Sequence, residues 1–215
     1  VVFDHFPSDT SLIRPDLRLI TGDLIRRHGF EEWRAAVITN ELHRHLGIYS
    51  ILGVKMGLRA REILGATLDD LRVESHAGLA PPLSCMNDGL QVSTGASLGR
   101  GTITVLSGKS AANGPGSGDD TPEAAGPDGG CGSSPRHDDH PVPEALFIMD
   151  GRRVTLRIKP EIVERIRSDI ARAIDTHGNL TPEYFAEVRR LSLTYWLDMD
   201  REEIFLEAAG RTPAR

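Results

Sequence analysis

The sequence predicts one α+β domain, in which a small, largely antiparallel sheet is flanked by helices and interrupted by a disordered insertion. Three observations carry this prediction. Long segments repeat apolar residues at helical spacing, shorter segments alternate as strands do, and residues 107–143 are rich in glycine and proline. A chain of 215 residues can bury one sizeable core. We expect the domain to comprise residues 1–106 and 144–208, with a flexible tail at 209–215.

Five long segments are predicted as helices from their apolar spacing and their end signals. They run from Pro15 to His28, Phe30 to Asn40, Ile48 to Leu64, Pro160 to His177 and Thr181 to about Leu197. The segment from Ile48 is the strongest, and Ser50, Gly53 and Gly57 give it an edge where another backbone can approach closely. We expect this edge to form a dimer contact, and the competing interpretation is that a strand or helix of the same chain covers it. A cap at Asp200 and Glu203 predicts a last helical turn that includes Phe205.

Alternating apolar residues predict the strands. The candidates are Leu71–Ser75, Thr102–Leu106, Ala145–Met149 and Arg152–Ile158, and Asp150-Gly151 between the last two is a hairpin signal. Met86 to Ser93 is expected to form a short helix or a helical turn.

Residues 107–143 contain eight glycines, six prolines and no aromatic side chain. Such a segment cannot bury enough apolar surface to offset the entropy of ordering, so we expect it to be disordered. Cys131 would then be a free, solvated thiol, and His137 and His140 would keep the segment soluble.

Composition excludes several classes of protein. A net charge of −6 gives no basic field for nucleic acid, and no apolar run is long enough to span a membrane. The first residues show no signal peptide, and two cysteines do not make a disulfide framework. We therefore expect a cytoplasmic protein.

Residues 84–101 concentrate polar groups that a buried strand does not need. Asp88 can cap the next segment, orient a metal ligand or act as a general base. Gln91 and Thr94 either lie on an exposed face or bind a polar ligand. Arg100, in a glycine-rich run, either helps to hold an anion or belongs to a tight turn.

His43 and His45 project to the same side if the backbone between them is extended. Together with the thiol of Cys85 they would provide two nitrogens and one sulfur, which suits zinc with an open fourth position. By itself the spacing favours an ordinary pair of histidines at a helix end. A lone cysteine, likewise, is most often a small buried apolar residue.

The two stretches together resemble the FmdE-like family of formylmethanofuran dehydrogenase proteins. That family carries His-x-His, a glycine-punctuated helix and then a Cys-x-x-Asp-Gly-x-Gln-x-x-Thr-Gly run. Here these are His43-x-His45, Gly53 and Gly57, and the run from Cys85 to Gly95. Many members have cysteines where this chain has Gly47 and Ala96, and Arg100 replaces a lysine.

The resemblance implies a metal-binding protein, with zinc or another divalent transition metal on His43, His45 and Cys85. It further implies a small polar ligand, such as a one-carbon group, bound near Gln91, Thr94 and Arg100, and a homodimer. A molybdenum or tungsten oxidoreductase is the implied partner. Two alternatives stay open: a metallohydrolase-like enzyme with Asp88 as base and zinc-bound water as nucleophile, or an interaction module with a structural metal. The loss of two thiols argues against redox chemistry by this chain.

Overall fold

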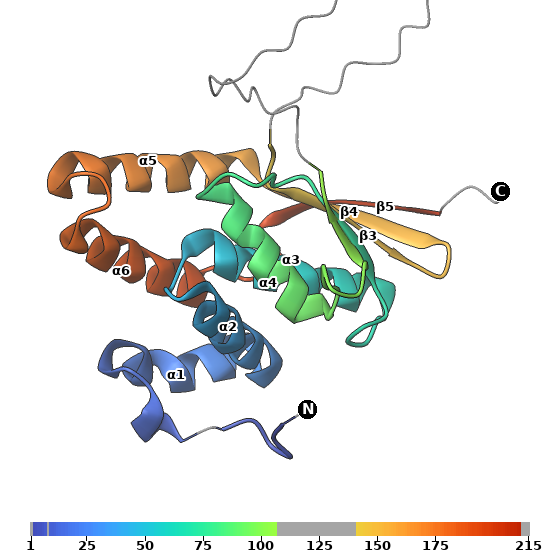
Figure 1. Cartoon of the computed structure of the whole chain (residues 1–215), viewed down its shortest axis with the longest axis horizontal. Helices are drawn as coiled ribbons and strands as arrows, with labels where there is room; N and C mark the ends of the chain where they lie inside the picture. The colour runs from blue at the N-terminus through green and yellow to red at the C-terminus, as the bar shows by residue number, and fades with distance from the viewer. Residues whose placement is uncertain (1, 8, 107–140, 212–215) are drawn as a thin grey trace, which may run out of the picture.

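The computed structural model describes residues 2–7, 9–106 and 141–211, and Figure 1 shows a single sheet lying to one side of a group of helices. The α-helices of these residues are α1 (Pro15–His28), α2 (Phe30–His43), α3 (Ile48–Leu64), α4 (Met86–Thr94), α5 (Pro160–His177) and α6 (Pro182–Asp198), with short 3-10 turns at Thr10–Leu12 and Leu83–Cys85. The predicted α+β class is confirmed.

The sheet has five strands in the order β2-β1-β3-β4-β5. They are β1 (Arg72–Ser75), β2 (Ile103–Val105), β3 (Glu144–Met149), β4 (Arg152–Ile158) and β5 (Phe205–Arg211). Only β1 and β2 pair in parallel, so the sheet is largely antiparallel. Asp150 and Gly151 both have positive φ values, 47° and 74°, as the predicted two-residue hairpin turn requires.

Strand β5 corrects the prediction for the C-terminal end of the chain. The sequence predicts a helical turn through Phe205 and a flexible tail from 209, but residues 205–211 pair with β4 along their whole length. Ala208, Ala209 and Gly210 have low intrinsic preference for strands. The strand forms because β4 offers its backbone, which no local pattern reveals.

The predicted insertion lies mostly outside the described residues, which end at 106 and resume at 141. Cys131, His137 and His140 lie in that part of the chain. The last residues of the predicted insertion are described, and the Val142 amide donates to the His76 carbonyl at 2.9 Å. Val142 therefore belongs to the folded domain, two residues before the predicted boundary at 144.

Helix α3 lies at the centre of the fold and is buried on nearly every side. One face, which includes Leu52, joins the core against the sheet with Phe147. The opposite face, which includes Ile51, packs against Trp33 of α2 and Trp196 of α6. Among the described residues, no helix is long and apolar enough to cross a membrane.

Helix α4 crosses α3 at the edge of small residues predicted from the sequence, and Figure 1 shows the two helices side by side. A Cβ atom added to Gly53 would overlap the carbonyl oxygen of Met86 in α4, and one added to Gly89 would overlap the backbone of Ser50 and Val54. The expectation that this edge forms a dimer contact is therefore wrong, because a helix of the same chain already covers it.

Candidate functional site

The close approach of α3 and α4 places the start of α4 beside the end of α2. Helix α2 ends at His43, and the turn Leu83–Cys85 leads directly into α4. Asn87, in the first turn of α4, donates to the Gly78 carbonyl at 2.9 Å and accepts from the Ser75 hydroxyl at 2.6 Å. These buried bonds tie α4 to strand β1 and fix the position from which Cys85 and Asp88 project.

The imidazole of His43 is held by a carboxylate. Its Nδ1 atom lies 2.7 Å from Oδ2 of Asp88, and the side chain is only 12% exposed. A carboxylate at Nδ1 favours a proton on that nitrogen, so Nε2 of the neutral ring presents its lone pair. The same pairing orients histidines that bind metals, and it also orients histidines that act as bases.

The other ring nitrogen of His43 is buried and unsatisfied. Among the described residues, Nε2 has no hydrogen-bond partner, although almost all buried polar atoms in proteins have one. The backbone passes close to it at Gly47, where an added Cβ would lie 3.5 Å from Nε2. A nitrogen held in this way could coordinate a metal ion or accept a hydrogen bond from a ligand.

His45 lies against His43, but the backbone between them is not extended. Arg44 adopts a left-handed conformation with φ of 70°, which is uncommon outside glycine. The two rings are 4.2 Å apart between centroids, and His45 is largely exposed. Partial burial and the neighbouring His43 lower the pKa of His45, which keeps its ring neutral and able to donate a lone pair.

Cys85 lies between two cavities, each of which is also lined by one of the histidines. The first cavity, of about 300 Å³, includes His43, Cys85, Asp88 and Gln91 in its wall. The second, of about 160 Å³, includes His45 and Cys85. Burial, together with the charge of Asp88, raises the pKa of the Cys85 thiol.

The three predicted donors are neighbours without forming a ready-made metal site. In the part of the chain that the structure describes, no three His, Cys, Asp or Glu side chains are already arranged to hold a metal ion. The donor types and the unsatisfied nitrogen of His43 fit a metal such as zinc. Binding would require a change of rotamer, for which the exposed ring of His45 has room.

The other predicted site residues occupy three different environments. Gln91 lines the larger cavity and accepts a bond from the Leu98 amide at 3.2 Å. Thr94 is fully buried, and its hydroxyl donates to the Leu90 carbonyl at 2.6 Å at the end of α4. Arg100 is exposed and pairs with Asp69. The structure therefore brings Gln91, but neither Thr94 nor Arg100, to the cavity beside His43.

Sequence reasoning missed the aromatic wall of the smaller cavity. Tyr184 and Phe185 come from the first turn of α6, where Thr181 caps the helix by accepting from the Tyr184 amide at 3.1 Å. Tyr49 of α3 adds a third ring. An apolar aromatic residue at an exposed helix start is the sequence signal that could have drawn attention to Phe185.

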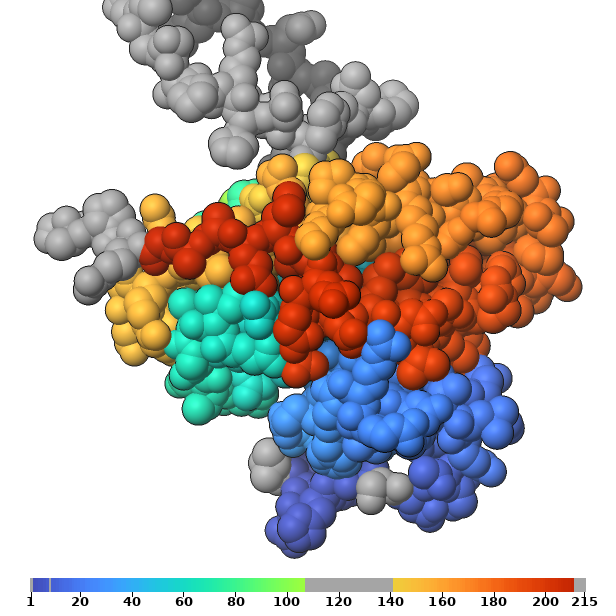
Figure 2. Space-filling model, turned by 180° about the vertical axis from the view of Figure 1, so that it is seen from behind, coloured from blue at the N-terminus to red at the C-terminus, as the bar shows by residue number. Residues whose placement is uncertain are grey.

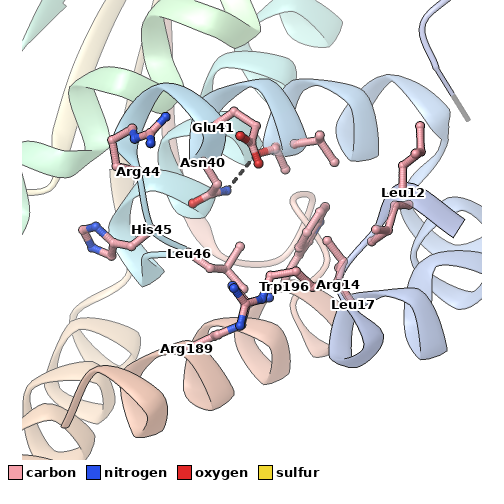
Figure 3. A pocket seen from close by; sticks show the side chains of 13 residues that line it. Leu12, Arg14, Leu17, Asn40, Glu41, Arg44, His45, Leu46, Arg189 and Trp196 are labelled. Carbon is pink, nitrogen blue, oxygen red and sulfur yellow. Dashed lines mark hydrogen bonds between the residues drawn. The ribbon is translucent and has the colours of Figure 1, made fainter. Parts of the chain in front are cut away.

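A third cavity, of about 310 Å³, opens between α1, α2 and α6. Figure 3 shows Trp196 and Arg189 inside it, whereas Arg44 extends away toward its rim. Arg189 already pairs with both carboxylate oxygens of Asp16. Arg14, Glu41 and Arg44 also line this cavity, but of the predicted metal donors it includes only His45 and neither His43 nor Cys85.

Comparison with protein families gives one match. The family model described as "FmdE, Molybdenum formylmethanofuran dehydrogenase operon" matches residues 42–205. The matched range begins one residue before His43, includes Cys85 and ends at the first residue of β5. Helix α1 and nearly all of α2 precede it. No curated protein matches the chain.

Proposed function

Because the chain belongs to the FmdE family, whose model matches residues 42–205, we propose that it binds a divalent transition metal, zinc, through His43, His45 and Cys85. The metal would bind a small polar ligand, such as a one-carbon carbonyl or carboxylate, in the larger of the two cavities, whose wall includes His43, Cys85 and Gln91. The protein would act as an accessory to a formylmethanofuran dehydrogenase-type molybdenum or tungsten enzyme, which the name of the family supports.

One observation carries the metal proposal: Nε2 of His43 is buried and unpartnered among the described residues while Nδ1 is fixed by Asp88. Leaving a buried acceptor unsatisfied costs about 1–3 kcal/mol. A metal ion that takes this lone pair would remove that cost. It would also explain why a carboxylate orients the ring from the other side.

The engagement of Asp88 supports the role of an orienting group over that of a general base. One of its carboxylate oxygens is already occupied by His43, and the side chain is 31% exposed at the edge of the larger cavity. A metallohydrolase would need a carboxylate or imidazole free to accept a proton from the nucleophile. Gln91 is better placed to bind the ligand, because its amide lies on the same cavity wall.

The test is the metal content of the purified protein. We expect close to one zinc per chain by elemental mass spectrometry, and loss of most of it in His43→Ala and in Cys85→Ser. Cys131→Ser, which changes the other cysteine of the chain, and His177→Ala are the matched controls and should retain the metal. A folded wild-type protein that takes up no zinc, nickel or cobalt would contradict the proposal.

We also propose a homodimer, which the family resemblance implies and which no longer rests on the edge of α3. Light scattering at micromolar concentration measures it directly. A mass near 47 kDa, twice the 23.5 kDa of the chain, is expected. A mass of one chain at every concentration would reject the dimer and leave the metal proposal standing.

A further inference from the structure

The third cavity, between α1, α2 and α6, is built largely by the part of the chain that precedes the family match. Most of the residues in its wall come before residue 42, where the match begins. Leu17, Val37 and Leu46 give it an apolar surface from three segments of the chain. Its volume of about 310 Å³ lies at the lower end of the range of about 300–1,000 Å³ for cavities that bind small molecules. It is therefore large enough for a small organic ligand.

Helix α6 places a charged and an aromatic side chain on the same wall of this cavity. Arg189 and Trp196 are seven residues apart, so they project from the same face of the helix, and Figure 3 shows both inside the cavity. Trp196 is fully buried, and among the described residues its indole Nε1 has no hydrogen-bond partner. Because an indole nitrogen can only donate, a ligand with a hydrogen-bond acceptor would satisfy it.

The charged side chains around the cavity favour an anion. Nε and Nη2 of Arg189 bond to Asp16, which leaves Nη1 without a partner among the described residues. Arg14 and Arg44 also line the cavity, and neither forms an ion pair with another described residue. Among the described residues Glu41 is the one acidic side chain in the wall, and Figure 3 shows it across the cavity from Arg189. One net positive charge therefore remains to be balanced.

We propose that the third cavity binds a monocarboxylate with an apolar chain, of the size of octanoate. The carboxylate would accept hydrogen bonds from Nη1 of Arg189 and Nε1 of Trp196, and the chain would lie against the apolar wall. A monoanion suits the site better than a phosphate, because a second negative charge would be buried without a partner. Of the predicted metal donors only His45 lines the cavity, so this inference goes beyond the proposed function and does not rest on a metal.

Titration calorimetry of the whole protein with octanoate tests the proposal. We expect saturable binding of one octanoate per chain, and binding at least about tenfold weaker for octan-1-ol, which keeps the chain but lacks the charge. Acetate, which keeps the charge but lacks the chain, should also bind at least about tenfold more weakly. Absence of saturable octanoate binding, or equal affinities for octanoate and octan-1-ol, would overturn the proposal.

Asp16→Asn is the sharpest variant, because it removes the carboxylate that occupies Arg189. It should tighten the binding of octanoate by about threefold or more, whereas a pair that only supported the fold would weaken binding when broken. Asp175→Asn removes the same charge from an exposed position on α5, so it is the matched control and should leave the Kd unchanged. Unchanged or weaker binding in Asp16→Asn would overturn the proposed contact with Arg189.

Two further variants separate this cavity from the rest of the molecule. Arg14→Gln should weaken octanoate binding by about threefold or more, and Arg152→Gln, exposed on β4 outside the cavity, should leave it unchanged. Cys85→Ser removes a proposed metal donor and should also leave the Kd unchanged. If Cys85→Ser abolishes binding and Arg14→Gln does not weaken it, the carboxylate binds at the metal site, which overturns this proposal and leaves the metal proposal standing.

Discussion

His43 is the residue on which the metal proposal depends most, and its orientation depends on Asp88. The carboxylate fixes Nδ1 at 2.7 Å and so decides which nitrogen faces the buried space near Gly47. Neither residue could act in this way alone, because an imidazole free to rotate would present either nitrogen.

Asp88→Asn should therefore lower the affinity for zinc about 10–100-fold without removing a ligand, since an amide is a weaker partner for the Nδ1 proton. Competition with a chromophoric chelator measures the change. Asp175→Asn, an exposed carboxylate on α5, is the control and should bind zinc as the wild type does. An unchanged affinity in Asp88→Asn would show that the pair does not support a ligand.

Asn87 positions the same turn through bonds to Ser75 and Gly78. Asn87→Ala leaves both partners unsatisfied in a buried place, so we expect the free energy of unfolding to fall by about 1–3 kcal/mol. Urea unfolding measures it. Asn179→Ala, at an exposed position between α5 and α6, should change it by less than about 0.5 kcal/mol. Similar losses in both variants would contradict a special role for Asn87.

At this scale the sequence indicates the types of donor but not their surroundings. His43, Cys85 and Gln91 stand out by composition, and the structure places them on one cavity wall. Thr94 stands out for the same reason, yet its hydroxyl is used to end α4. A threonine whose hydroxyl bonds the backbone of its own helix and one that binds a ligand look alike in sequence, because the same hydroxyl can do either.

At the scale of elements, the crossing of α3 and α4 decides where the site lies. Gly53→Ala should lower the free energy of unfolding by about 3 kcal/mol or more, because the new methyl group meets the backbone at Met86, which cannot move aside. Gly22→Ala on α1 is the matched control, since the added Cβ meets open space. This substitution should stabilise the helix by about 0.5–1 kcal/mol. Equal effects of the two substitutions, measured by thermal unfolding, would show that the helices can separate without cost.

Helices α1 and α6 are joined by Asp16 and Arg189, and this bond gives a pH-dependent prediction. The guanidinium of Arg189 lowers the pKa of Asp16 from 3.8 to about 2. A carboxyl whose pKa is lower in the folded state stabilises the fold above about pH 4, and the contribution disappears as the pH falls toward 2.

Asp16→Asn should thus cost at most about 1 kcal/mol at pH 6, because the carboxylate is partly exposed and screened. The difference from wild type should shrink between pH 4 and pH 2 in urea unfolding. Asp175→Asn should show no such trend. A difference that stays constant down to pH 2 would mean that Asp16 acts through packing and not through its charge.

The elements themselves follow the local sequence where capping and period agree. The helices at Pro15, Ile48 and Pro160 begin and end where their proline and glycine signals indicate. Helix α2 runs to His43, beyond the predicted end at Asn40, because no glycine or proline stops it earlier. Strand β5 could not be predicted, because its small residues pair with a strand that lies two helices earlier in the chain.

At the scale of the whole molecule, α1 and most of α2 lie outside the residues that match the family. Buried charged side chains attach these helices to the matched part of the chain. Glu32 of α2 accepts from Nζ of Lys55 at 2.6 Å and from Nη1 of Arg201 at 3.0 Å, and both Glu32 and Lys55 are fully buried. Figure 2 shows α2 lying against the segment that leads into β5, where Arg201 also donates to the carbonyl of His28.

Glu32→Gln should cost about 3–5 kcal/mol, because it leaves Lys55 charged and unpaired in the core. Glu31→Gln, next to it on the exposed face of α2, should cost less than about 0.5 kcal/mol and serves as the control. Urea unfolding of both variants measures the difference. If Glu32→Gln is as stable as Glu31→Gln, the N-terminal helices are not held by this pair.

The central proposal, a metal on His43, His45 and Cys85, is tested most directly by the zinc-edge X-ray absorption spectrum of the loaded protein. We expect one sulfur at about 2.3 Å and two imidazole nitrogens at about 2.0–2.1 Å. Cys85→Ser should remove the sulfur, while Cys131→Ser should leave the spectrum unchanged. A spectrum without sulfur, or one that Cys85→Ser does not alter, would contradict the proposed site.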